Sequence, residues 1–196
     1  MDYKVWQVTS AFVSFAQGIN AQLYQVPETL SKDVLEKIHA VKFDIPVITP
    51  QELVKADGFL LGLPTRYGIC PAQIKTFWDA TGGLWAKGEL AGKYCGMFTS
   101  SGTQHGGNKL FWRLTRAGQE STVFTFLPVL AHHGMIYVPF GYSSGLVSDN
   151  SEVLGGSPWG ASTIAGSDGS RQPNDKECGI AFEQGASFGI ILNKVI

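Results

Sequence analysis

Residues 59–85 read FLLGLPTRYGICPAQIKTFWDATGGLW, and the order of residue types predicts a strand, a loop and a helix. The uncharged apolar run 59–63 is typical of a short, fully buried strand. Pro64 interrupts it, and Thr65–Gly68 follows as a polar loop. Pro71 stands where a helix can begin, because its fixed φ and missing N–H are tolerated at the first helical position. Loops after the carboxyl ends of strands bind ligands in open α/β sheets, so this loop is a candidate binding site.

The composition indicates one globular domain spanning residues 1–196. The net charge is −1, with 44% hydrophobic and 16% charged residues, which suits a sizeable core and gives no case for nucleic acid as a partner. Three scattered cysteines without a CxxC pair favour a reducing compartment over a disulfide framework or zinc site. Neither a signal peptide nor an apolar run of about 18 residues is found, so we expect a cytoplasmic protein without integral membrane contact.

The remaining pattern alternates between apolar runs and helical segments, which predicts an α/β fold with a parallel sheet and helices on both faces. Residues 81–83 are expected to form a loop that carries Leu84 and Trp85. Residues 141–173 are expected to hold neither helix nor strand and to serve a function or an interface. We expect further strands over 22–26, 93–99 and 135–138, and further helices around 34–38, over 50–56 and 120–130, and from Asn174 or Asp175 onward.

A second polar loop, Ser100–Gly107 (SSGTQHGG), follows the strand over 93–99. Because carboxyl ends of parallel strands meet at one edge of a sheet, we expect it beside the Thr65–Gly68 loop. Both loops can equally be plain connectors, and composition alone leaves the two interpretations open.

Two histidines, His132 and His133, end the 120–130 helix before Gly134. At this position a histidine is more often a helix cap than a catalyst. No acid or cysteine lies at metal-ligand spacing, so no metal is expected. A Ser–His–Asp hydrolase is disfavoured because no GxSxG elbow is present. Trp85 can line a pocket or simply cover the core.

Several long motifs, in one order, resemble the WrbA family of NAD(P)H:quinone oxidoreductases in its fungal branch. The similarity covers roughly residues 22–107 and 118–188, and its motifs are GLPTRYG, FWDATGGLWAKGELAGKY, SSGTQHGG, QEST, LAHHGMIYVPFGY and GGSPWGASTIAGSDGSRQP. The resemblance implies a flavodoxin-like three-layer α/β/α fold with FMN as cofactor. It also implies hydride transfer from NADH or NADPH to the flavin, followed by two-electron reduction of a quinone.

The resemblance further assigns roles to residues. Thr65, Arg66 and Tyr67 would hold the isoalloxazine ring. Trp85 would close the substrate pocket, and His133, as the catalytic residue, would lie over the flavin where nicotinamide or quinone stacks. The family is typically a homotetramer, with residues 141–173 near neighbouring subunits. The residues that would wrap the flavin edge and ribityl chain are Ser100, Ser101, Gly102, Thr103, Gln104, His105 and Gly106.

Two departures from the family pattern are evident. Relatives carry an S-x-Y-G-H loop that binds the FMN phosphate at a helix N-terminus, and none is found between Met1 and Asn20. The flavodoxin-like sheet is therefore expected to lack or replace its first strand, which is central in the order 2-1-3-4-5. Residues 108–118 also interrupt the GGQEST motif as an insert.

Three hypotheses follow from these departures. The first is an FMN-dependent quinone reductase, cytoplasmic or peripheral at the plasma membrane. The second is a non-catalytic flavodoxin-like subunit or degenerate paralogue with impaired FMN binding, which forms a hetero-oligomer with active paralogues. The third is a chain that does not fold stably.

Overall fold

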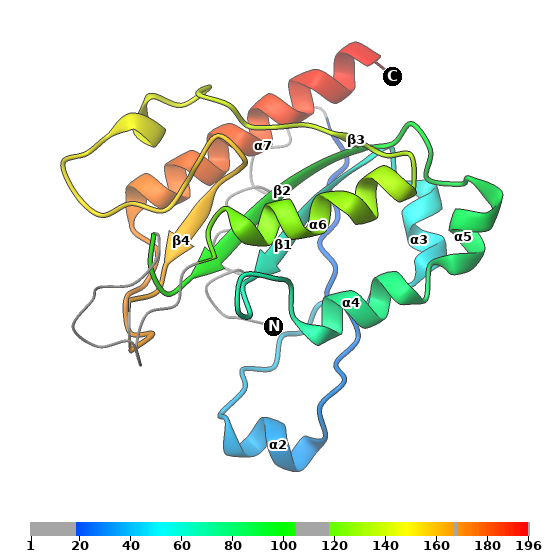
Figure 1. Ribbon diagram of the computed structural model, residues 1–196, viewed down its shortest axis with the longest axis horizontal. Coiled ribbons are helices and arrows are strands. Elements are labelled where there is room, and N and C mark those ends of the chain that lie inside the picture. Colours follow the sequence, from blue (N-terminus) through cyan, green and yellow to red (C-terminus); the bar gives the residue numbers. More distant parts are fainter. Residues whose placement is uncertain (1–18, 105–117, 167, 196) are drawn as a thin grey trace.

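A parallel sheet forms the centre of the protein. The computed structural model describes residues 19–104, 118–166 and 168–195 (Figure 1). β1 pairs with β2 along its whole length, whereas β3 and β4 pair with opposite ends of β2 and therefore share its other edge. Every pairing is parallel. The strands are β1 (Gly58–Pro64), β2 (Tyr94–Ser101), β3 (Ile136–Tyr137) and β4 (Ser162–Ile164).

Helices cover both faces of this sheet, which confirms the predicted three-layer α/β/α arrangement. Figure 1 shows α4 (Ala72–Asp79) and α6 (Ser121–His132) on one side and α7 (Asp175–Val195) on the other. α2 protrudes from the body and buries no residue. Within the described residues, no helix is both long and apolar enough to cross a bilayer. The other helical segments are α2 (Lys32–Lys37), α3 (Pro50–Lys55), α5 (Gly82–Lys87) and the 3-10 helix η1 (Gly145–Ser148).

Side chains of β2 alternate between two hydrophobic clusters, as the period of two in a strand requires. Cys95 and Met97 join the cluster under α4 and α6, whereas Phe98 joins the cluster under α7. In the first cluster, the rings of Trp78 and Phe126 meet edge to face with centroids 5.7 Å apart. Both faces of β2 are thus buried, as expected for a parallel sheet.

The prediction of a loop over residues 81–83 is wrong, because Gly82 and Gly83 begin helix α5. Thr81 precedes the helix, and its carbonyl accepts hydrogen bonds from the N–H groups of Leu84 and Trp85. Leu84 is buried in the core. Its burial outweighs the low helix propensity of two glycines, which costs about 1 kcal/mol each relative to alanine.

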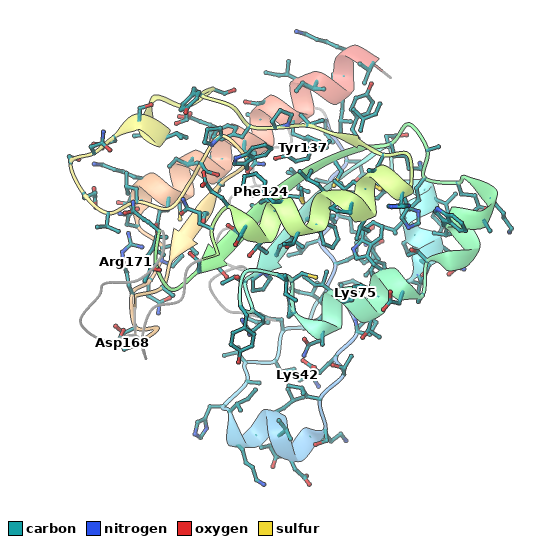
Figure 2. The ribbon with its side chains drawn as sticks, in the orientation of Figure 1. Lys42, Lys75, Phe124, Tyr137, Asp168 and Arg171 are labelled. Carbon is teal, nitrogen blue, oxygen red and sulfur yellow. The ribbon has the colours of Figure 1, made fainter. Side chains whose placement is uncertain are left out.

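The prediction that residues 141–173 hold no regular structure is also wrong, since they contain η1 and the short strand β4. The segment is tied to α7 by Glu177, whose carboxylate is fully buried. Its Oε1 accepts from Gly155 N–H at 2.9 Å, and its Oε2 accepts from Thr163 Oγ1 at 3.0 Å. Arg171 donates to both oxygens at 2.8 and 2.9 Å, and Figure 2 shows it beside the end of β4.

Two other expectations change in detail. Among the described residues, the expected strand 22–26 forms a single parallel bridge, between Gln25 and Val47. The strand expected to be fully buried, β1, is half-exposed from Gly58 to Gly62, and only Leu63 and Pro64 are buried. Some of the burial expected for β1 is therefore not provided by the described residues.

Candidate functional site

The Thr65–Gly68 loop is a tight turn held against the sheet. Thr65 N–H donates to the carbonyl of Ser100 at 3.0 Å, which extends the β1–β2 pairing by one residue. Arg66 and Ile69 then exchange backbone hydrogen bonds of 2.7 and 3.1 Å. The two central residues have positive φ, 56° for Tyr67 and 84° for Gly68. This is the φ pattern of a type I′ turn, which is normally built from glycine, asparagine and aspartate.

Tyr67 is the unusual residue of this turn. A non-glycine residue in the left-handed region costs on the order of 1–3 kcal/mol and persists where the surroundings impose it. Its side chain is fully exposed, at 103% of the reference area, so no burial of the ring compensates the strain. Arg66 beside it is also exposed, and its Nη1 donates to the Thr65 carbonyl at 2.8 Å. The turn therefore exposes an aromatic ring and a guanidinium at the sheet edge.

The first turn of α6 imposes this geometry. Thr65 Oγ1 accepts from Gly68 N–H at 3.1 Å and from Thr122 Oγ1 at 2.8 Å. Thr125 Oγ1 donates to the Gly68 carbonyl at 3.2 Å. Gly118 has φ 152°, and a Cβ there would collide with Thr65 Oγ1. The loop is thus locked by α6 on its inner side while its outer side stays open.

The second predicted loop begins two residues later than expected. Ser100 and Ser101 are buried residues of β2 that pair with Thr163 and Ile164 of β4. The bend consists of Gly102, Thr103 and Gln104, and Gln104 Nε2 is held by the Leu154 carbonyl at 2.9 Å. His105, Gly106 and Gly107 of this loop lie outside the described residues, as do residues 108–117 of the 108–118 insert.

The expected adjacency of the two polar segments is confirmed. Pro64 and Ser100 are paired residues at the carboxyl ends of β1 and β2. The sheet therefore places the hydroxyl and backbone groups at the end of β2 next to the exposed Arg66 and Tyr67. Together these residues form one polar edge, which we call the ligand-facing edge because open α/β sheets bind ligands at the carboxyl ends of their strands.

Gln119 is a candidate site residue that the polar-loop pattern does not reveal, although it begins the QEST motif. Its side chain is buried, and its Nε2 donates to the Gly156 carbonyl at 3.1 Å. Its Oε1 is buried and has no hydrogen-bond partner among the described residues. A buried acceptor without a partner is costly, so this oxygen is available to a ligand donor.

His133 lies at the opposite edge of the sheet. It follows the last residue of α6, a helix whose 12 residues span about 18 Å, whereas the first turn of α6 braces the Thr65–Gly68 loop. Its Nε2 is 2.9 Å from Thr81 Oγ1, and its ring meets Trp78 edge to face at 5.5 Å. Nδ1 is buried without a partner among the described residues. Desolvation lowers the pKa of His133, which favours the neutral imidazole.

Trp85 lies at this second edge too, on helix α5 rather than in the expected glycine-rich loop. Its side chain is 57% exposed. Within one copy of the chain, the structure therefore separates His133 and Trp85 from the ligand-facing edge.

Cys70 follows the strained turn but has no feature of a nucleophile. Burial raises the pKa of its thiol, and no cation outweighs this effect, so the thiolate is disfavoured at neutral pH.

The protein belongs to the NADPH-dependent FMN reductase family, whose pattern matches residues 4–145. It is 51% identical over 174 residues to NAD(P)H quinone oxidoreductase PST2 of Candida albicans, across 88% of this chain and 81% of the relative. It is also 51% identical over 180 residues to quinone-oxidoreductase QR2 of Triphysaria versicolor, across 91% and 82% of the two chains.

Solved structures agree on the fold. A WrbA-like flavodoxin from Agrobacterium tumefaciens matches with a TM-score of 0.60 at 16% identity, over 97% of this chain and 90% of that one. A flavodoxin from the domain Archaea gives 0.55 at 15% identity, over 98% and 93%. The fold is flavodoxin-like, and the resemblance seen in the sequence is confirmed.

The described residues fit the ring side of FMN. A flat ring with polar edges matches the exposed Tyr67 and Arg66, the unpartnered Gln119 Oε1 and the backbone of the bend at Gly102. The phosphate loop of relatives is not found between Met1 and Asn20, and residues 1–18 of that stretch lie outside the described residues.

Proposed function

We propose that this protein is an FMN-dependent NAD(P)H:quinone oxidoreductase. The observation that carries the proposal is the strained, fully exposed Tyr67 turn beside the end of β2. Strain of this kind concentrates at ligand sites, and here it lies at the strand ends where open α/β sheets bind ligands. Membership of the FMN reductase family and relatives named as quinone oxidoreductases support the same function.

The chain's own residues would position the flavin. FMN, when bound, supplies the hydride and electron chemistry. Arg66 would donate to the polar edge of the ring and place a positive charge there. Tyr67 would offer its ring as a flat contact, and Thr65 would keep the turn in shape from below. Ser100, Ser101 and the bend Gly102–Gln104 would border the opposite side of the ring and the ribityl chain, together with His105 and Gly106.

His133 and Trp85 would act in a homo-oligomer, in keeping with the expected tetramer. Because they lie across the sheet from the loops of their own copy, they would serve the flavin held by another copy. The exposure of Trp85 on α5 supports this role, since an indole ring can cover a flat ligand. Neutral His133 would offer one ring nitrogen to the substrate while Thr81 holds the other.

A degenerate paralogue with impaired FMN binding is the second candidate. It is favoured by the burial of His133, whose accessible area is 9% of its reference value. Under this hypothesis the chain would keep the fold and its edge but act only as a non-catalytic subunit beside active paralogues. The free thiols Cys70, Cys95 and Cys178 fit a cytoplasmic location for either candidate.

Flavin loading and turnover separate these candidates. The purified chain is incubated with excess FMN, desalted, and assayed for flavin absorbance and for quinone-dependent oxidation of NADH and NADPH. We expect bound flavin and turnover with at least one nucleotide. A folded, colourless and inactive protein that copurifies with an intact relative would instead support the non-catalytic subunit.

A further inference from the structure

Glu177 carries a fully buried carboxylate in the first turn of α7, and it makes more hydrogen bonds than a helix end requires. Its N–H donates to Asn174 Oδ1 at 2.9 Å, and its Oε2 accepts from Asn174 N–H at 3.2 Å. These two bonds form a capping box, for which glutamine serves as well as glutamate. A capping box needs neither burial nor an arginine, so it does not explain the other contacts of this carboxylate.

The other contacts reach two segments outside α7, which are the chain around Gly155 and the end of β4. Oε1 of the carboxylate accepts from the N–H groups of Gly155 at 2.9 Å and Ile164 at 3.3 Å. Arg171, which binds both carboxylate oxygens, also donates to the carbonyls of Ile164 at 2.7 Å and Val153 at 3.1 Å. The buried ion pair therefore fastens both segments to α7.

The same two segments hold the polar bend that follows β2. The Leu154 carbonyl, next to Gly155, accepts from Gln104 Nε2 at 2.9 Å. Ala165 N–H, directly after β4, donates to the Ser101 carbonyl at 2.7 Å. The bend is thus attached at both of its ends to segments that the ion pair fastens.

Gln119 is attached to the first of these segments. Its Nε2 donates to the Gly156 carbonyl at 3.1 Å. Because a carbonyl can only accept, the amide nitrogen must face Gly156, and the atom without a partner among the described residues is the acceptor Oε1. Leu154 and Gly156 therefore hold one glutamine each, and Gly155 between them is held by Glu177.

We propose that Glu177, paired with Arg171, is a positioning residue of the flavin site. This role rests on the proposed function, in which the bend Gly102–Gln104 borders the flavin. Several N–H donors and a guanidinium converge on Glu177, and an ionised carboxylate has the acceptor capacity to bind them all. Its pairing with arginine offsets part of the cost of burying the charge. The pair thereby sets the place of the bend and of Gln119 from the α7 side of the sheet.

A purely structural role is the alternative, since breaking a buried ion pair destabilises a fold strongly. Under that alternative, a variant that still folds keeps its flavin affinity. Positioning predicts instead that the affinity falls in a folded variant, because the carbonyls that orient Gln104 and Gln119 are no longer held in place. Folding and FMN binding measured on the same preparation therefore separate the two roles.

Glu177→Gln tests the proposal in the full chain. The glutamine has the same shape and keeps the capping box, but its amide nitrogen cannot accept from the other donors. We expect the variant, with folding checked by circular dichroism, to bind FMN roughly tenfold more weakly in a fluorescence titration. The matched control is Glu183→Gln, the same chemical change on the same helix, which should bind FMN as the wild type does. Unchanged affinity in folded Glu177→Gln would overturn the proposal.

A double-mutant cycle with Gln104→Ala supplies a readout that a purely structural role would not move. Gln104→Ala removes one of the groups that Glu177 is proposed to position. The combined loss of FMN affinity in Glu177→Gln/Gln104→Ala should therefore be smaller than the product of the two single losses. Single losses that multiply in the double variant would contradict action through the bend.

Amide hydrogen exchange measured by NMR needs no flavin. Ala165 N–H, which donates to Ser101, should exchange about tenfold faster in Glu177→Gln, whereas Phe98 N–H in β2 should be unchanged. Arg171→Lys keeps the charge but loses the forked contact with both oxygens, and it should show the same pattern if Glu177→Gln does not fold. A wild type that binds no FMN would refute the proposed function, whereas unchanged exchange at Ala165 would overturn the positioning role whether or not FMN binds.

Discussion

The two ends of α6 both make contacts through threonine hydroxyls, but the first end braces an exposed turn and the last end encloses a histidine. At its first turn, Thr122 and Thr125 fasten a turn whose Tyr67 and Arg66 remain open to solvent. At its last turn, His133 is enclosed by Thr81 and Trp78. One end has local strain and exposed side chains, and the other encloses a histidine whose Nδ1 is buried without a hydrogen-bond partner among the described residues. The comparison indicates that Arg66 and Tyr67, and not the enclosed His133, are the side chains that one copy of the chain exposes at its ligand-facing edge.

The largest expected effect comes from the middle of α6, which both ends depend on. Phe126 is fully buried against Trp78, and Phe126→Ala should cost about 3–5 kcal/mol of unfolding free energy. Urea denaturation followed by far-UV circular dichroism measures it. The neighbour Phe124, 43% exposed, supplies the control Phe124→Ala, which should cost much less. Equal losses would show that α6 is not packed as described.

At the first turn of α6, which braces the Thr65–Gly68 turn, removing the Thr65 hydroxyl should loosen that turn. Thr65→Val leaves Gly68 N–H and Thr122 Oγ1 without their acceptor, at a cost of about 1–3 kcal/mol. Flavin affinity should fall as well, because the turn is no longer held. Denaturation and FMN fluorescence titration measure the two effects. Thr76→Val, on the outer face of α4, is the control, and comparable losses in both variants would contradict a specific role for Thr65.

Tyr67 should show a trade-off between stability and binding. Asparagine tolerates the left-handed region better than tyrosine, so Tyr67→Asn should stabilise the fold by about 0.5–1 kcal/mol through relief of strain. The same change removes the exposed ring and should weaken FMN binding. Thermal unfolding and flavin titration on the same preparation measure both. A variant that is destabilised and binds FMN as before would refute the interpretation of the strain.

The smallest expected effect is a pH dependence of the unfolding free energy, caused by His133 at the last turn of α6. The pKa of folded His133 is lowered by desolvation, so the unfolded chain binds its proton first as pH falls. Stability should therefore decrease as pH falls through about 6.5 towards the folded pKa. Unfolding free energies of the wild type and His133→Asn between pH 7.5 and 5 test this. The exposed neighbour gives the control His132→Asn, which should keep the slope that His133→Asn loses.

The sequence predicts the layers and the ligand-facing edge because these depend on local patterns. Apolar runs mark β1 and β2, and the polar residues after each strand must meet where parallel strands end. The position of His133 can also be predicted from the parallel arrangement of the strands. A helix between parallel strands runs back across the sheet, so its last residue lies at the edge opposite to the loops.

Other features depend on contacts that local patterns do not contain. Helix α5 begins with two glycines and exists because Leu84 is buried. Strand β4 has only three residues and is held by Glu177, which comes from a distant helix. The partial exposure of β1 could not be predicted from the sequence either, since its apolar residues are those of a buried strand.

The most direct test of the central claim is an FMN titration of Arg66→Ala beside the wild type, followed by quenching of flavin fluorescence. The loss of a charge-assisted hydrogen bond of about 1.5–3 kcal/mol should weaken binding by roughly ten- to a hundredfold. Lys75, on the neighbouring helix α4 (Figure 2), is paired with Asp79, and Lys75→Ala should bind FMN as the wild type does. Unchanged affinity in Arg66→Ala would remove the Thr65–Gly68 turn from the flavin site and contradict the account.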